Sequence, residues 1–383
     1  MIRHIVYECL PGAFAGGVQK MVFELAGAQR RLGADVEIWT PDAIRAGSME
    51  IFDGLPIRYF RPDSAWGYVR SKDLVAALAR LPLGTVIHAH CTFHPINHDV
   101  ATAARTQGLR LFFHPHGALD PILFSDWSLK SIKKRLYLRF IGLPDINAAA
   151  GIFALTPLEA QQLASLSVAA PIHIVPNGIV PVPFVPLESA RAFRVKHRIV
   201  PTDKVILFVG RIMAKKRLED IIAAFAALRA SLGALTLAIA GDISQDPAYH
   251  RRLKETATKL DCADSIRWLG FLDESAKPAA FAAADCFVHA SESEGMALAI
   301  LEAMSAGLPT VVTRGCYMRQ AAEAGAVSEC AQGATALTEA IRQVLEDPDF
   351  AAGLRERART YALKEYDWSR LAALMLEIYV GKA

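Results

Sequence analysis

Several features that would assign a sequence to a class at once are missing from these 383 residues. No apolar run approaches the roughly 18 residues that span a bilayer, and no secretory signal follows Met1, so we expect an intracellular protein. The six cysteines include no Cys-x-x-Cys pair, which argues against a zinc site and a disulfide framework and predicts buried free thiols. A net charge of +3 is too small for a dedicated nucleic-acid binder.

Common cofactor signatures are also missing. No Gly-x-Gly-x-x-Gly follows the first expected strand, which disfavours a nicotinamide dehydrogenase, and no Walker loop is present. Asp347-Pro348-Asp349 has the spacing of a metal-binding Asp-x-Asp, but Asp before Pro is typical of a helix start. The histidines between residues 88 and 98 have no carboxylate at a ligand spacing, so no metal site is assigned.

Short β-rich apolar runs alternate with helical patterns, which predicts an α/β fold with parallel sheets. The expected strands are His4–Leu10, Asp35–Thr40, Thr85–His90, Arg110–His114, Gly151–Leu155, Ile172–Val175, Val205–Val209, Leu235–Ala240, Ile266–Leu269, Cys286–His289 and Pro309–Val312. Prolines between Pro171 and Pro201 interrupt both periodicities and predict a linker near residue 180. An apolar stripe from Trp368 to Val380 predicts a helix that covers some surface.

Ligands bind beyond the carboxyl ends of the strands in such sheets, so the residues that follow each strand are the informative ones. In the first half, Gly16-Gly17 opens a helix and suits either a backbone anion site or a plain tight turn. His114 and His116, just before Gly117, suit polar substrate contact or proton handling, or form a hydrogen-bonded pair in a loop.

In the second half, Gly210-Arg211 is followed by Lys215-Lys216-Arg217 at a strand-to-helix turn. Four cations within seven residues suit a phosphate or diphosphate, with a solvated basic turn as the alternative. Glu294 precedes a helix expected to start near Gly295, and Glu302 lies two turns further along the same face. The backbone amides of residues 295–297 would then be available to an anion.

Together these motifs resemble the retaining, nucleotide-sugar-dependent glycosyltransferases of family 4. The resemblance rests on Gly16-Gly17, His116-Gly117, Pro176-Asn177-Gly178-Ile179, Gly210-Arg211 with Lys216, Ala240-Gly241-Asp242 and, above all, the stretch from Glu294 through Glu302 to Pro309. It implies the GT-B fold, in which two Rossmann-like, doubly wound parallel-sheet domains face each other across a cleft. The implied domains are residues 1–180 for the acceptor, residues 181–365 for the nucleotide sugar, and a helix at 366–383 that crosses back to the first domain.

The resemblance also implies the site residues. The catalytic group would be His116, Arg211, Lys216 and Glu294, and the donor-binding group Gly16, Gly17, Gly210, Arg211, Lys216, Gly241, Glu294, Gly295, Met296, Ala297 and Glu302. Arg211 and Lys216 would bind the diphosphate and Glu302 the ribose hydroxyls, while Glu294 and His116 would contact the sugar. No metal or other cofactor is expected. The family commonly has Gly after the lysine and Phe-Gly after Glu294-Gly295, where this chain has Arg217, Met296 and Ala297, so donor choice is open.

The implied reaction moves a hexose from a UDP- or GDP-sugar to a glycan acceptor with retention of configuration, in exopolysaccharide or lipopolysaccharide assembly. Residues 125–140 carry a charge of +4 interleaved with apolar residues, from Leu129 to Phe140. Such a helix suits an anionic membrane surface and a polyprenyl-diphosphate-linked acceptor, or simply packs its apolar stripe on the sheet. The location expected is cytoplasmic, peripheral on the inner face of the membrane. Alternatives are a noncatalytic nucleotide-sugar-binding scaffold, and an epimerase or phosphorylase on the same fold.

Overall fold

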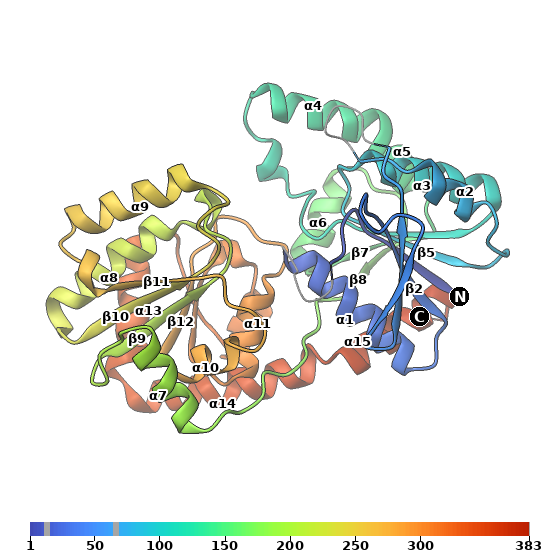
Figure 1. Cartoon of the computed structure of the whole chain (residues 1–383). Coiled ribbons are helices and arrows are strands. Elements are labelled where there is room, and N and C mark those ends of the chain that lie inside the picture. Colours follow the sequence, from blue (N-terminus) through green and yellow to red (C-terminus); the bar gives the residue numbers. More distant parts are fainter. Residues whose placement is uncertain (11–15, 64–68, 383) are drawn as a thin grey trace. The chain divides into compact units, whose positions relative to one another are not determined.

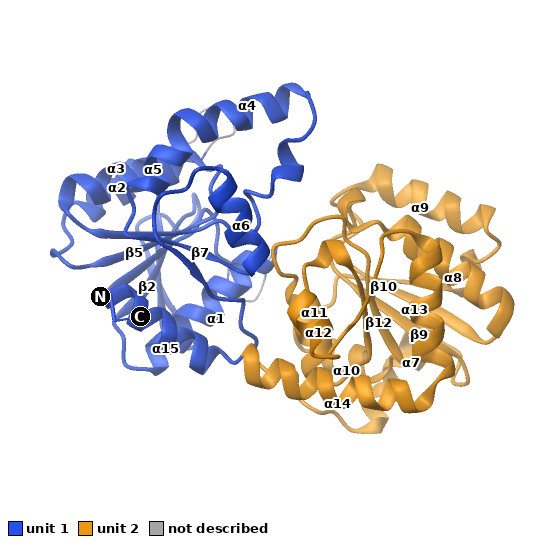
Figure 2. Ribbon diagram, turned by 180° about the vertical axis from the view of Figure 1, so that it is seen from behind, with its two compact units in different colours: residues 1–179, 367–383 blue, residues 180–366 orange. Residues whose placement is uncertain are grey.

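The computed structural model describes residues 1–10, 16–63 and 69–382, and the chain divides into two compact units. Unit 1 comprises Met1–Ile179 and Asp367–Ala383, and unit 2 comprises Val180–Tyr366 (Figure 2). The expected boundaries at 180/181 and 365/366 lie beside these divisions. The last helix, which follows Tyr366, therefore packs within unit 1.

Unit 1 is built on an eight-stranded sheet with the order β3-β4-β2-β1-β5-β6-β7-β8 (Figure 1). The strands are β1 (Ile2–Ile5), β2 (Val36–Pro41), β3 (Met49–Phe52), β4 (Leu55–Phe60), β5 (Val86–His90), β6 (Arg110–His114), β7 (Gly151–Ala154) and β8 (Ile172–Ile174). All neighbours pair parallel except β3 and β4, which form an antiparallel hairpin. In the register, His4 lies opposite His88 and His90 lies opposite His114, so four imidazoles share one face of the sheet.

The helices of unit 1 lie on both faces of this sheet. They are α1 (Gly17–Arg31), α2 (Lys72–Leu78), α3 (Pro95–Gln107), α4 (Leu129–Tyr137), α5 (Leu143–Asn147), α6 (Pro157–Ser165) and α15 (Trp368–Val380), with a 3-10 turn η1 (Pro121–Phe124) and a π-helical turn η2 (Leu138–Gly142). Helix α15 lies beside α1 (Figure 1), and its buried side chains run from Trp368 through Leu371 and Met375 to Tyr379. This spacing is the stripe that the sequence predicts.

Unit 2 has a six-stranded parallel sheet with the order β11-β10-β9-β12-β13-β14. The strands are β9 (Lys204–Val209), β10 (Leu235–Ala240), β11 (Ile266–Gly270), β12 (Cys286–His289), β13 (Thr310–Thr313) and β14 (Ser328–Cys330). Numbered within the unit, the order is 3-2-1-4-5-6, the doubly wound arrangement of dinucleotide-binding folds. The order in which successive strands are added to the sheet reverses between β9 and β12. Folds of this kind bind their ligands at that reversal point.

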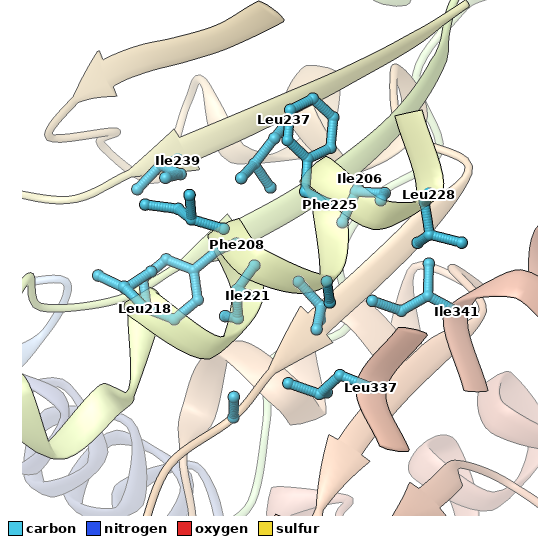
Figure 3. Packing of buried hydrophobic residues seen from close by; sticks show 14 of the residues in the cluster. Ile206, Phe208, Leu218, Ile221, Phe225, Leu228, Leu237, Ile239, Leu337 and Ile341 are labelled. Carbon is cyan, nitrogen blue, oxygen red and sulfur yellow. The ribbon is translucent and has the colours of Figure 1, made fainter. Parts of the chain in front are cut away.

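The helices of unit 2 pack on both faces of its sheet. They are α7 (Leu187–Lys196), α8 (Leu218–Leu232), α9 (Pro247–Lys259), α10 (Lys277–Ala282), α11 (Leu298–Ser305), α12 (Arg319–Glu323), α13 (Ala334–Glu346) and α14 (Pro348–Glu365), with 3-10 turns η3 (Ala214–Lys216), η4 (Ala263–Ser265) and η5 (Arg314–Cys316). Figure 3 shows Phe208 and Ile239 from the sheet against Phe225 from α8, with Ile341 of α13 completing the layer. Because α8 buries every third or fourth residue, it contributes one continuous apolar face to this core.

Several sequence predictions are confirmed here. The α/β class is correct, and Asp347 caps α14 by accepting a hydrogen bond from the Phe350 amide at 2.9 Å, with Pro348 in the first turn. The six cysteines are free thiols, four of them buried. No helix in the described ranges combines the length and apolar composition needed to span a membrane. Strands β3, β4 and β14 were not predicted.

Candidate functional site

The carboxyl ends of β9 and β10 meet through two glycines. Gly210 donates a hydrogen bond to the Ala240 carbonyl at 2.9 Å, and a Cβ atom on Gly241 would lie 2.1 Å from the Gly210 carbonyl oxygen. No side chain fits at Gly241, so its presence is required by the contact between the two loops. The predicted donor-site glycines 210 and 241 thus lie together at the reversal point of the unit 2 sheet.

Lys216 and Glu294 form a buried ion pair at the ends of β9 and β12. The Lys216 ammonium binds the Glu294 carboxylate and lies 3.4 Å from Nε2 of His289, the last residue of β12. Ser291 also donates a hydrogen bond to Glu294. Glu294 and His289 account for two of the three N–H donors of Lys216. The pair was predicted as two separate ligand contacts, and the structure shows that the two groups bind each other.

Backbone contacts bring these two side chains together. The Glu292 amide donates to the Lys215 carbonyl at 2.9 Å, which ties the loop after β12 to the loop after β9. On its other side, the Ser291 carbonyl accepts hydrogen bonds from Thr313 Oγ1 at 3.1 Å and Gln332 Nε2 at 2.9 Å. The loop is therefore held in place independently of the ion pair.

The electrostatics keep Glu294 charged and His289 neutral. Burial alone would raise the pKa of Glu294, but the charge of Lys216 and the contact with His289 outweigh it and hold that pKa well below its usual range. Burial, with the Lys216 charge acting in the same direction, lowers the pKa of His289. At neutral pH the site therefore has one carboxylate and one ammonium that compensate each other, beside a neutral imidazole.

Glu302 lies in a second, separate charge pair. It is buried in α11, and Lys277 Nζ from the start of α10 lies 3.1 and 3.2 Å from its two carboxylate oxygens. Lys277 also binds Glu274 at 2.7 Å. Lys277 was not predicted from the sequence, because it lies 25 residues from Glu302 in the chain.

The helix after β12 begins later than predicted. It starts at Leu298, with Ala297 as its N-cap residue, so Glu294 lies in the preceding loop and shares no helix face with Glu302. The reason is that residues 291 and 292 are tied to neighbouring loops and hold the chain in a non-helical path. Gly295 and Ala297 are half-buried and Met296 is buried. Arg211 is exposed and makes no hydrogen bond or ion pair with any residue of the described chain.

Arg217 has an unusual backbone conformation. Its φ of 52° and ψ of 43° lie in the left-handed region, which is strained for any residue with a side chain. Its guanidinium lies 3.1 Å from Asp220. The glycine that the family commonly has after this lysine is explained by the same conformation, which glycine adopts without strain.

In unit 1, the predicted Gly-rich turn lies partly outside the described residues. Residues 11–15 are not described, Gly16 is the N-cap residue of α1, and Gly17 is its first residue. Gly16 has extended backbone angles and no neighbouring atom within 4 Å of the position that a Cβ would occupy. The described part of the turn thus leaves open space at Gly16.

His116 lies in the loop after β6 and is held there by a buried carboxylate. It has a left-handed backbone, with a φ of 57°, and the next residue, Gly117, has a φ of 73°. The Gly117 and Leu155 amides each donate to the Glu159 carboxylate at 2.7 Å. Thr156 caps α6 by accepting a hydrogen bond from the Glu159 amide, while the Glu159 side chain has this further role, which the sequence did not reveal.

Four histidines gather behind His116 on the sheet. The buried side chains of His4, His88, His90 and His114 lie next to it, and burial lowers the pKa of all five, that of His116 to about 3. Two groups of three, His4-His88-His90 and His90-His114-His116, have ring nitrogens within 4.8 Å of one another, a spacing compatible with a transition metal. Several of these nitrogens already bind each other, so a metal ion would have to replace those hydrogen bonds.

The basic helix exposes Leu129, Leu136 and Phe140, which the alternative would pack on the sheet, while Ile132 and Tyr137 are half-buried. We use the name α4 patch for exposed apolar residues and cations around α4, namely Trp127, Leu129, Leu136 and Phe140 with Lys130, Lys133 and Arg139. Trp127 is 83% and Leu129 78% exposed. Arg135 stacks over Trp127, with its guanidinium carbon 4.8 Å from the ring centre.

Each half of the chain matches a known protein family. Residues 15–181 match the family model described as Glycosyltransferase Family 4, and residues 189–364 match the model described as Glycosyl transferases group 1. A glycogen synthase of Mycobacterium tuberculosis is 32% identical over 178 residues, which are 46% of this chain and 42% of that protein. The chain thus spans less than half the length of that relative. A GDP-mannose:cellobiosyl-diphosphopolyprenol alpha-mannosyltransferase of Komagataeibacter xylinus is 26% identical over 396 residues, covering 99% of this chain and 92% of that one.

Solved structures share the fold over nearly the whole chain. Sucrose-phosphate synthase from Thermosynechococcus elongatus has a TM-score of 0.80 at 21% identity and covers 99% of this chain and 98% of its own. Anabaena HepE in complex with UDP-glucose has a TM-score of 0.78 at 18% identity and covers 98% of each chain. At this level of identity the likeness establishes the architecture alone.

Proposed function

The chain is an enzyme that belongs to the group 1 glycosyltransferases with the GT-B fold, and from this premise we propose that it transfers a hexose from a UDP- or GDP-sugar to a glycan acceptor with retention of configuration. The observation that carries the donor assignment is the buried Lys216–Glu294 pair at the reversal point of the unit 2 sheet, with the exposed Arg211 on the same loop. Anabaena HepE, which shares the fold, is described in complex with UDP-glucose.

The proposed roles follow from charge. The diphosphate would bind Arg211 and the remaining N–H donor of Lys216, and both cations would stabilise the nucleoside diphosphate as negative charge develops on it. Glu294, kept ionised by Lys216, can accept hydrogen bonds only, and so suits hydroxyl groups of the sugar. Glu302, oriented by Lys277, suits the ribose hydroxyls.

We expect transfer without a metal ion, because Arg211 and Lys216 can supply the positive charge that a metal would otherwise provide. In a direct test, activity measured with EDTA would equal activity measured with added Mg²⁺ or Mn²⁺. A strict requirement for a divalent ion would contradict this part of the proposal. The configuration of the product, read by NMR of the anomeric proton, tests retention; an inverted anomer would refute it.

The proposed acceptor is a glycan on a polyprenyl diphosphate at the inner face of the cytoplasmic membrane, in bacterial surface polysaccharide assembly. The support is the α4 patch, in which exposed Trp127 and Phe140 accompany cations that suit anionic lipid. The relative from Komagataeibacter xylinus is named for a diphosphopolyprenol substrate.

Co-sedimentation with vesicles tests the membrane contact. The wild type should pellet with anionic phosphatidylglycerol vesicles more than with neutral phosphatidylcholine vesicles, and Trp127→Ser with Lys130→Glu should abolish the difference. Lys254→Glu with Lys259→Glu, two exposed lysines of α9, is the matched control and should change little. Equal binding of the wild type to both vesicle types would remove the lipid proposal.

Nucleotide binding is the first experiment. UDP or GDP at about 100 times its dissociation constant should add roughly 2.7 kcal/mol to the folded state, and only one base should do so. Glu302→Gln should weaken the stabilisation by the correct nucleotide. A noncatalytic scaffold would bind the nucleotide sugar and release no nucleoside diphosphate in the presence of acceptor, so turnover separates the two functions.

A further inference from the structure

A single chain of hydrogen bonds crosses the interior of unit 1. Its members come from five elements, α15, α1, β1, β5 and the loop after β6, and each binds the next through side-chain atoms. They are Tyr379, Gln29, His4, His90 and His116, with His88 attached to Tyr379. All except His116 are buried, and His116 is the member that reaches the surface.

The first links set the direction of the chain. The Gln29 amide nitrogen donates to the Tyr379 hydroxyl at 3.4 Å, and that hydroxyl lies 2.6 Å from Nδ1 of His88. The Gln29 oxygen therefore faces Nε2 of His4, at 2.8 Å, and accepts a hydrogen bond from it. Gln29 thus requires the proton of His4 to lie on Nε2.

The remaining links follow because each imidazole is neutral and has one N–H. With its proton on Nε2, His4 can only accept at Nδ1, and the donor is Nε2 of His90 at 3.0 Å. His90 in turn can only accept at Nδ1, where Nε2 of His116 donates at 3.0 Å. His116 is left with its proton on Nε2 and an unprotonated Nδ1.

We infer that Gln29 and Tyr379 are positioning residues, which set through His4 and His90 the tautomer of His116 that leaves Nδ1 as a hydrogen-bond acceptor for a hydroxyl group of the substrate. The inference rests on the proposed function for the identity of the substrate as a sugar. An acceptor nitrogen on a neutral ring suits a hydroxyl and disfavours a phosphate oxygen, which has no proton to donate.

Two further contacts hold the ring of His116 in place. Glu159 fixes the Gly117 amide, so the backbone of the loop cannot turn freely. The ring of His114 stacks on that of His116, with centroids 3.9 Å apart. The position of the His116 ring is thus held by the backbone and by stacking. The hydrogen-bond chain determines which ring nitrogen of His116 carries the proton.

The test is the tautomer itself, read by long-range ¹H–¹⁵N correlation spectra of ¹⁵N-histidine-labelled full-length protein, with His116→Gln used only to assign the signals. The expected result is a neutral His116 protonated at Nε2. Protonation at Nδ1 in the wild type would overturn the inference. This readout needs no turnover, so it stands apart from the proposed function, which fails if the wild type transfers no sugar.

Two variants test the remote residues. Gln29→Met and Tyr379→Phe should each give His116 a mixture of tautomers, and with equal populations kcat/KM would fall about twofold because half of the protein would present the acceptor. Tyr59→Phe removes another buried tyrosine hydroxyl of unit 1 and should change neither readout. An unchanged His116 tautomer in both variants, or a transition metal found by elemental analysis and lost in His114→Phe, would refute the role of the chain.

Discussion

Replacing Lys216 by methionine should destabilise unit 2 and reverse the titration behaviour of Glu294. Lys216 and Glu294 are 9% and 12% exposed at their side chains, so solvent screens neither charge effectively. Removing one partner of a buried ion pair costs about 3–5 kcal/mol, because the other charge is left uncompensated. The neighbours His289 and Ser291 remain as partial compensation, and we expect a loss of about 3 kcal/mol at neutral pH.

The pH dependence gives the sharper test. In the wild type the pKa of Glu294 is lower in the folded protein than in the unfolded chain, where it is about 4.3. The ionised carboxylate therefore contributes to the free energy of unfolding above that pH, and the contribution is lost as the pH falls toward the lower folded pKa. Without Lys216, burial raises the pKa of Glu294 instead, and protonation relieves the uncompensated charge. The difference between wild type and Lys216→Met should therefore be largest near neutral pH and shrink toward about pH 4.

Hydrogen exchange in graded urea, followed on peptides from β12 and α11, measures this local stability in unit 2. The double variant Lys216→Met/Glu294→Gln removes both charges and should recover much of the loss seen in either single variant. An equal loss of stability at neutral pH and at about pH 4 would show that the two charges do not compensate each other as the geometry indicates. A double variant no more stable than the single variants would show the same.

Three further predictions concern positions that the backbone or packing constrains. Arg217→Gly should be about 1 kcal/mol more stable than Arg217→Ala, with a Tm about 2–4 °C higher by calorimetry, because only glycine relieves the left-handed backbone; equal melting temperatures would contradict this. Glu159→Gln should lower the free energy of unfolding in urea by about 1.5–3 kcal/mol, since one of the two backbone amides that donate to Glu159 would face an NH₂ group. Glu159→Asp keeps the charge on a shorter side chain and therefore tests reach rather than charge. Gly178→Ala should loosen α15 and make it sensitive to protease, because the new Cβ would lie 2.3 Å from the Trp368 ring; an unchanged digestion pattern would count against that contact.

Regular strands with a buried apolar run are well predicted from the sequence. Arg110–His114, Leu235–Ala240 and Cys286–His289 are predicted with their observed bounds, because each is a short segment dominated by buried apolar residues. The hairpin of β3 and β4 was missed; three of the four residues of β3 are apolar, but all four are exposed. Its turn residues, Asp53 and Gly54, both have positive φ and form a recognisable hairpin signal that could have revealed it.

Contacts within the candidate site were less predictable, because they join residues far apart in the chain. The sequence identified Lys216 and Glu294, yet their pairing depends on β9 and β12 lying side by side, which no local pattern encodes. His88 and Tyr379 are 291 residues apart and meet only because the last helix returns to unit 1. Lys277 and Glu159 likewise acquire their roles from the tertiary structure.

The two candidate regions stabilise buried polar groups by different means, and this difference bears on what each can bind. In unit 2, Glu294 stays ionised because Lys216 lies beside it, so the site keeps strong charges that suit an anionic diphosphate. In unit 1, burial holds the five histidines neutral, and their hydrogen bonds, rather than charges, satisfy most of their nitrogens. Such a neutral network discriminates between donors and acceptors of hydrogen bonds. It therefore suits the recognition of hydroxyl groups, and a carboxylate placed within it, as in Gln29→Glu, would attract protons to His4 and replace that discrimination by charge.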